Sequence, residues 1–171
     1  MRRTALSVLI LLGAALLQTN ALSEEAKNKD QLYVHSVIDG DTIILSDGIR
    51  VRLIGIDTPE LHFSNKLLRD SRRSGKKISV LQKMGEQAAG FTKSVCLGRR
   101  VRLEYDIEKE DRYGRTLAYV CLDDGTFINA QIIKAGYASV MTVSPNVKYA
   151  DLFVNLVSEA RDAKRGLWKD D

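Results

Sequence analysis

VRLIGIDTPE, residues 51–60, joins a strand pattern to a sharp turn. Val51 and Leu53 face one side of the expected strand and Arg52 faces the other, because successive side chains of a strand alternate. Pro59 fixes its own φ and favours an extended residue before it, so the strand ends here. Three side chains with oxygen atoms lie on this turn: Asp57, Thr58 and Glu60. An arginine, two carboxylates and a hydroxyl on one loop suit a hard cation and a phosphate group.

The patterns on either side of this stretch predict an α+β protein that is mainly β. The expected strands span residues 32–38, 43–45, 51–54, 101–105 and 115–122, and the expected helices span 85–98, 128–136 and 149–166. Residues 61–83 are basic and weakly patterned, so we expect a surface loop with a short helical piece. Five short strands with an intervening helix are compatible with a small closed barrel, and we expect a five-stranded OB-fold barrel with three packed α-helices.

The N-terminus predicts a secretory signal peptide over residues 1–21. Arg2 and Arg3 precede an apolar run, and small residues at positions 19 and 21 suit cleavage after Ala21. An uncleaved membrane anchor is the less favoured alternative, because the apolar run is shorter than the roughly 20 residues that a bilayer core needs. We expect residues 22–30 to form a flexible leader and residues 31–169 to form one domain. We therefore expect an exported protein, periplasmic or secreted, that is monomeric and has no stable membrane association after cleavage.

The charge of the whole chain says little about its partners. The formal net charge of +4 includes the two arginines of the signal peptide. The distribution is more informative, because one basic cluster is offset only by Asp70. Its members are Lys66, Arg69, Arg72, Arg73, Lys76 and Lys77. Such a run is usually a solvated face, but beside a phosphate site it would also steer a polyanion.

Cys96 and Cys121 are the two cysteines of the chain. Export places them in an oxidising compartment, which favours a structural disulfide over two buried free thiols. A zinc site with His35 and His62 is the other alternative, and the irregular spacing disfavours it.

Three polar clusters are candidates for chemistry. The first holds Asp39 and Asp41, the second is the turn after Arg52, and the third is the segment 112–115, which reads Arg-Tyr-Gly-Arg. Each has an ordinary explanation by itself, since Asp-Gly turns are common and a strand arginine often covers a hydrophobic edge. Their combination in one domain is harder to explain without a function.

These clusters resemble the signature blocks of the staphylococcal nuclease (thermonuclease) family. The three blocks are Val37–Thr42, Arg52–Glu60 and Asp111–Tyr119. The resemblance continues through Gly136–Ala138 and the last helix to Gly166–Trp168, so it covers essentially the whole domain. Three ordered motifs are far more specific than any one of them.

The resemblance implies an OB-fold and a calcium-dependent nuclease that cleaves DNA and RNA, preferably single-stranded, to products with 3′-phosphates. It assigns the roles residue by residue: Asp41, Asp57 and the backbone oxygen of Thr58 as calcium ligands, Glu60 as the catalytic carboxylate, Arg52 and Arg115 on the scissile phosphate, and Arg112 and Tyr113 on a terminal phosphate. General chemistry agrees with these roles. Calcium takes about six to eight oxygen ligands, an arginine fork binds phosphate at two points, and a carboxylate orients an attacking water.

Two features depart from the type enzyme of the family. The segment 61–83 is longer, which leads us to expect extra contacts to a nucleic-acid backbone. Met141 and Val143 stand where the type enzyme has tyrosines that frame a base, which affects base preference and affinity rather than phosphate chemistry.

Two other functions have to be weighed against a nuclease. A non-catalytic OB-fold module would bind single-stranded nucleic acid or a protein partner, but such degenerate copies are expected to lose an arginine or a carboxylate of the catalytic set. That set is complete here: Asp41, Arg52, Asp57, Glu60 and Arg115. A calcium-stabilised structural protein of the envelope would leave both arginines without a task. The fold alone does not choose among these functions.

Overall fold

The computed structural model describes residues 32–169, so the predicted signal peptide and leader over residues 1–30 lie outside the described residues. One folded unit begins at Tyr33. Its strands are β1 (Val34–Val37), β2 (Thr42–Leu45), β3 (Arg50–Leu53), β4 (Gly55–Asp57), β5 (Val101–Glu104), β6 (Thr116–Leu122) and β7 (Ser139–Met141). Its helices are α2 (Asn65–Ser74), α3 (Ile78–Cys96), α4 (Ile128–Lys134), α5 (Ala150–Asp162) and the short 3₁₀ turn η1 (Gly166–Trp168).

Five strands form one mixed sheet in the order β1-β2-β3-β6-β5. The first three are an antiparallel meander, as the turn residues between them predict. β6 lies parallel to β3 and antiparallel to β5, which brings the third signature block next to the second. β4 and β7 form a separate two-stranded sheet. The predicted α+β class with five main strands is therefore confirmed.

A glycine separates β3 from β4. Gly55 has φ +81°, a left-handed conformation that favours glycine, and a Cβ here would lie 2.5 Å from the ring of Phe153. The chain therefore leaves the main sheet at this point and delivers the turn of residues 57–60 beside it. Buried Asn129 fixes the same junction, because its amide donates to the Ile54 carbonyl (2.9 Å) and accepts the Val120 N–H (3.0 Å).

The sheet is not closed into a continuous barrel, which differs from the sequence prediction. Within residues 32–169, an isolated bridge between Tyr33 and Arg100 and a hydrogen bond from the Val34 N–H to the Arg99 carbonyl (2.9 Å) join the outer strands β1 and β5. Short edge strands make few such bonds, so an open sheet with one point of contact results.

The described part of the chain has four α-helices where three were predicted. The additional helix, α2, lies in the segment expected to be mostly loop, and α3 begins seven residues earlier than position 85. Ser64 caps α2 by accepting the Leu67 N–H (3.1 Å), and Gly75 ends it in the left-handed conformation. α2 is strongly polar and Leu67 is its one buried residue, so the segment has too few apolar positions to stand out as a helix in the sequence.

The predicted disulfide between Cys96 and Cys121 is not formed, and both are free thiols. The Cys96 thiol is buried at the end of α3, where it donates to the Thr92 carbonyl of its own helix (3.0 Å). Burial raises the pKa of Cys96 to about 12, which makes it an inert core residue. Cys121 is half-buried on β6, opposite Arg102 of β5. The two thiols thus lie in different environments, one in the core and one half-buried on the sheet.

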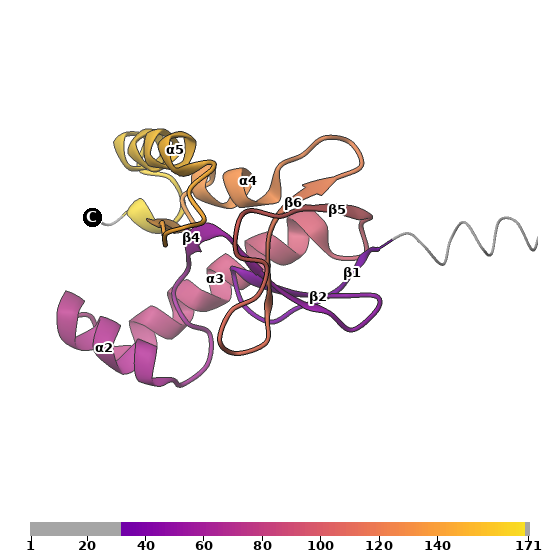
Figure 1. Cartoon of the computed structure of the whole chain (residues 1–171). Helices are drawn as coiled ribbons and strands as arrows, with labels where there is room; N and C mark the ends of the chain where they lie inside the picture. Colours follow the sequence, from indigo (N-terminus) through magenta and orange to yellow (C-terminus); the bar gives the residue numbers. More distant parts are fainter. Residues whose placement is uncertain (1–31, 170–171) are drawn as a thin grey trace, which may run out of the picture. The chain divides into compact units, whose positions relative to one another are not determined.

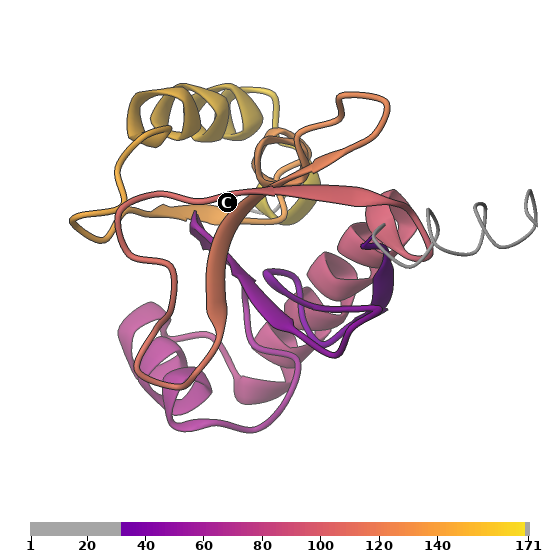
Figure 2. The ribbon, with the colours of Figure 1, turned by 45° about the vertical axis from the view of Figure 1, so that its right-hand side comes forward.

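Figures 1 and 2 show how the helices lie around the sheet. In both views α5 and α2 lie on opposite sides of the sheet, and the tip of the loop between β5 and β6 comes down beside α2. That loop carries the third signature block, so this block and α2 approach the same end of the fold. Across the described residues, the helices are all too short or too polar to span a bilayer.

Candidate active site

Asp41 joins two separate turns at one end of the sheet. It lies immediately before β2, with 5% of its surface exposed. One carboxylate oxygen accepts both the N–H (2.9 Å) and the hydroxyl (3.1 Å) of Thr58. The first polar cluster of the sequence is therefore held directly against the turn that follows β4.

Arg52 lies between the carboxylates of Asp41 and Asp57. Its side chain is 12% exposed, and its guanidinium is 3.2 Å from Asp41 and 3.4 Å from Asp57. It also donates to the carbonyl of Leu53 (2.9 Å), which fixes the direction of the fork. A largely buried guanidinium held at three points is a preorganised cation, and removal of one of its partners would leave an uncompensated charge.

The carboxylates around Arg52 are crowded and partly removed from water. Burial raises the pKa of Asp57, and the positive charge of Lys66 opposes this only in part. Burial and the negative charge of Asp41 raise the pKa of Asp39 to about 7. The excess of carboxylates makes this end of the sheet a place where an additional cation is favoured.

Lys66 of α2 supplies such a cation. Its ammonium is 3.0 Å from the carbonyl oxygen of Thr58, 3.2 Å from Glu60, 3.3 Å from Asp57 and 3.5 Å from Asp70. Three of these oxygens belong to residues 57–60 at the end of β4 and the turn after it, and the fourth belongs to Asp70, one helical turn along α2. In the sequence Lys66 belongs to a basic run, and no part in the site was predicted for it.

The donor atoms suit calcium. They are carboxylate and carbonyl oxygens, which hard cations prefer, and an ammonium already lies among them. Among residues 32–169, no three His, Cys, Asp or Glu side chains are grouped closely enough to hold a metal by themselves. A metal at this site would thus need the Thr58 carbonyl, water or substrate oxygens to complete its shell.

The third signature block is a tight loop held by Asp111. This carboxylate accepts two bonds from the Arg115 guanidinium (2.8 Å each) and the backbone N–H groups of Tyr113 and Arg115. Arg112 donates to the Tyr113 hydroxyl (2.7 Å) and lies over its ring. The loop therefore presents two arginines and an exposed tyrosine in fixed positions.

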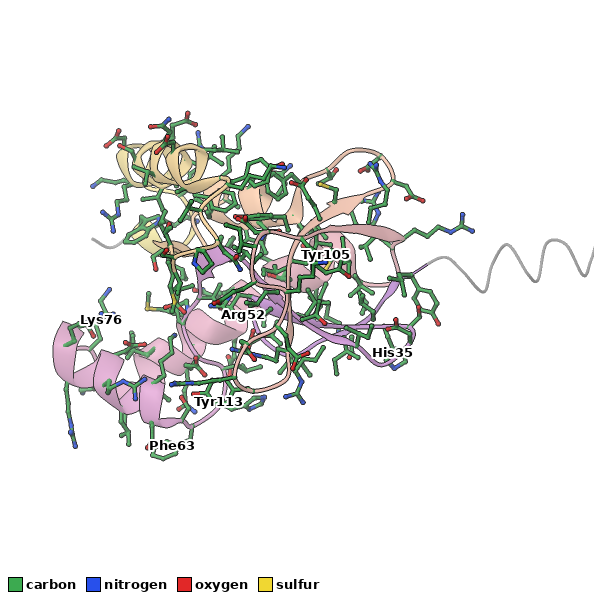
Figure 3. All side chains as sticks on the ribbon, viewed as in Figure 1. His35, Arg52, Phe63, Lys76, Tyr105 and Tyr113 are labelled. Atoms are coloured by element: carbon green, nitrogen blue, oxygen red, sulfur yellow. The ribbon has the colours of Figure 1, made fainter. Side chains whose placement is uncertain are left out.

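A cavity of about 570 Å³ connects this loop to β3, a size in the range of roughly 300–1,000 Å³ that is usual for ligand sites. Its polar walls include Arg52, Arg112, Tyr113 and Arg115, and its apolar walls include Met141 and Val143. Figure 3 labels Arg52, which β3 contributes, and Tyr113, which the loop between β5 and β6 contributes. Three arginines around one cavity can bind the oxygens of an anionic group, and Glu108, Glu110 and Asp111 line the same cavity.

Asp111→Asn is expected to lower the free energy of unfolding by about 1–2 kcal/mol at neutral pH. Burial alone would raise the pKa of Asp111, but hydrogen bonds from the Arg115 N–H, its guanidinium and the Tyr113 N–H hold the pKa below the usual value. A lowered pKa in the folded state stabilises the protein above the unfolded value of about 4, and this contribution is lost as the pH falls through the folded value. Urea unfolding at a series of pH values measures this contribution.

Asp162→Asn, at an exposed position of α5, is the control. A loss of unfolding free energy in Asp111→Asn that persisted unchanged into strong acid would contradict the assignment.

Comparison with known proteins now identifies the family. Residues 50–170 match the family described as staphylococcal nuclease homologue. A thermonuclease of Staphylococcus intermedius is 43% identical over 143 residues, covering 82% of this chain and 77% of the relative. The chain belongs to the staphylococcal nuclease family. A thermonuclease of Staphylococcus hyicus is 38% identical over 146 residues (84% and 78% of the two chains), and endonuclease YncB of Bacillus subtilis is 33% identical over 159 residues (88% and 69%).

The structure brings the candidate residues of this nuclease-family domain together in two groups. Asp41, Arg52, Asp57 and Thr58 contact one another directly, and Glu60 is joined to them through Lys66. The second group lies on the β5–β6 loop and shares one cavity with Arg52: Arg112, Tyr113 and Arg115. Sequence reasoning missed the roles of Lys66 and Asp70, and the (i, i+4) spacing of these two residues on a capped helix was the available signal.

Proposed function

We propose that this protein is an exported, calcium-dependent endonuclease that hydrolyses DNA and RNA to products with 3′-phosphates. The observation that carries the proposal is the largely buried Arg52, which bridges two carboxylates and lines the same cavity as the arginines of the β5–β6 loop. Membership of the nuclease family, with thermonucleases and endonucleases among the relatives, supports phosphodiester hydrolysis and a nucleic-acid substrate.

Arg52 and Arg115 would bind the scissile phosphate. The guanidinium fork matches two phosphate oxygens, and its charge stabilises the additional negative charge that develops as phosphorus becomes five-coordinate. Both side chains are anchored by carboxylates, so little reorganisation is needed when that charge appears. Arg112 and Tyr113 would hold a terminal phosphate, because both are exposed at the tip of the loop.

Glu60 would orient the attacking water. Its carboxylate is held by Lys66 (3.2 Å) and by the hydroxyl of Ser64 (3.3 Å), which limits its motion. A held carboxylate contributes mainly by positioning the water, and such positioning accounts for a large share of many rate enhancements. The apolar Met141 and Val143 on the cavity wall offer a base no strong hydrogen bond, so we propose weak base preference.

Calcium would be held by Asp41, Asp57 and the carbonyl oxygen of Thr58. When bound, it would neutralise charge on the phosphate and so reduce the repulsion that an attacking oxygen meets. The proposals that the protein is exported, monomeric and prefers single strands rest on the sequence and on the family resemblance. The basic residues on and after α2 would add backbone contacts that salt weakens.

Digestion of heat-denatured DNA by the purified protein tests this function. We expect cleavage with calcium, none with excess chelator, and recovery when calcium is restored. In the same assay Glu60→Gln is expected to reduce kcat by about 10²–10⁴-fold, since it removes the carboxylate charge and keeps the size of the side chain. Analysis of the product ends should find 3′-phosphates.

Binding without cleavage under every metal tried would contradict the proposal. That outcome would favour the alternative function, a module that binds single-stranded nucleic acid. Cleavage that chelator leaves unchanged would instead retain the nuclease and remove calcium from its mechanism.

A further inference from the structure

The ammonium of Lys66 occupies the oxygen atoms that the proposed function assigns to a metal ion. It lies 3.0 Å from the carbonyl of Thr58 and 3.3 Å from the carboxylate of Asp57. It also lies 3.2 Å from Glu60. One positive charge therefore contacts two of the proposed calcium ligands and the proposed catalytic carboxylate together.

Several contacts at the start of α2 fix the position of Lys66. Lys66 lies in the first turn of α2, directly after the turn that carries the three oxygens. Ser64 caps the helix, Leu67 anchors it in the core, and Asp70 holds the ammonium one helical turn away at 3.5 Å. Together these contacts fix the start of α2 next to the oxygens of residues 57–60. The position of Lys66 therefore does not depend on a single exposed ion pair.

A dipositive ion and an ammonium cannot share these oxygens without strong repulsion, because like charges at such distances in a partly buried site interact strongly. The side chain of Lys66 nevertheless has room to leave, since it is 26% exposed and lines a second cavity of about 310 Å³. Asp70 lines the same cavity and would remain as a partner for the displaced ammonium. Release thus needs a rotation of one side chain rather than the unfolding of α2.

We propose that Lys66 is an internal competitor of the metal ion, so that calcium enters the site only by displacing its ammonium from Thr58 and Asp57. This inference rests on the proposed calcium site. Lys66 then neutralises the carboxylates while no metal is bound, and it sets the calcium concentration at which the site fills.

Calcium titration by isothermal calorimetry measures the competition without any substrate. Lys66→Met is expected to bind calcium at least about tenfold more tightly than the unmodified protein, since a competing unit charge at contact distance is removed. Lys66→Gln, which keeps polarity without charge, should behave in the same way. Lys83→Met, at an exposed position of α3, is the matched control and should leave the affinity unchanged.

Lysine acetylation in the unmodified protein gives a second measurement that needs no variant. With a limiting amount of an N-hydroxysuccinimide ester, Lys66 should be acetylated slowly without calcium and several-fold faster with it, whereas the rate at Lys83 should not change. Peptide mass spectrometry follows both residues in one sample.

The outcomes separate this inference from the proposed function. Calcium binding that is equal or weaker in both Lys66 variants, or a calcium-independent acetylation rate at Lys66, would overturn the competition and leave the calcium nuclease intact. An absence of calcium binding in the unmodified protein and in both variants would overturn the competition and the calcium dependence together.

Discussion

Arg115→Lys is expected to reduce kcat by about 10²–10³-fold while changing KM much less. Arg115 makes two bonds to Asp111 at 2.8 Å and lines the cavity that also holds Arg52. Lysine keeps the charge, but it has no planar fork, so it cannot bond to Asp111 and to two phosphate oxygens in fixed directions. The lost interaction is one that strengthens as charge develops on the phosphate, and removal of a single such group costs about this factor.

Steady-state kinetics on heat-denatured DNA at saturating calcium measures this loss. Arg102→Lys is the matched control, because Arg102 is an exposed arginine on the neighbouring strand β5 and does not line the cavity. The free energy of unfolding should fall by no more than about 1 kcal/mol, since the Arg115 pair is partly exposed. An Arg115→Lys enzyme that kept its kcat would show that charge alone is needed, and Arg115 would then be a steering residue.

Much of the fold was predictable because its elements carry strong local signals. The meander of β1, β2 and β3 follows from Asp-Gly turns between alternating segments, and the apolar spacing of α5 is clear in the sequence. By contrast, β7 was missed, because a three-residue strand has too few positions to show a period of two. The single bridge between β1 and β5 depends on tertiary geometry that no local pattern encodes.

The residues of the candidate site could be named from the sequence for a different reason. Its arginines, carboxylates and Thr58 occur in short ordered motifs, so a family resemblance could suggest a role for each without knowledge of the contacts, and those roles stay predictions. Lys66 had no such motif, and a lysine in a basic run is ordinarily solvated. Its place in the site depends on where α2 begins, which is set by the Ser64 cap and the burial of Leu67.

The position of Glu60 depends on a close approach that the sequence also did not reveal. Gly85 of α3 packs against the turn that carries Glu60, and a Cβ at Gly85 would lie 2.5 Å from the carbonyl oxygen of Glu60 and 2.8 Å from the Leu61 nitrogen. Real Cβ atoms do not approach backbone this closely, so an alanine would force the turn or the helix to move. The backbone that a Cβ at Gly85 would meet is that of Glu60 itself, which carries the proposed catalytic carboxylate.

Gly85→Ala is therefore expected to lower kcat by about 10²-fold, because a displacement of roughly 1 Å at a reacting group has that effect. Overpacking should also lower the free energy of unfolding by about 1–3 kcal/mol.

Gly90→Ala is the matched control on the same helix, where a Cβ would meet no atom within 4 Å. Alanine is the better helix former, so this control should keep its kcat and gain up to about 1 kcal/mol of stability. Kinetics at saturating calcium and urea unfolding of both variants separate the two effects. A Gly85→Ala protein that is folded and fully active would show that Glu60 tolerates the displacement, and its proposed role in orienting the water would have to be withdrawn.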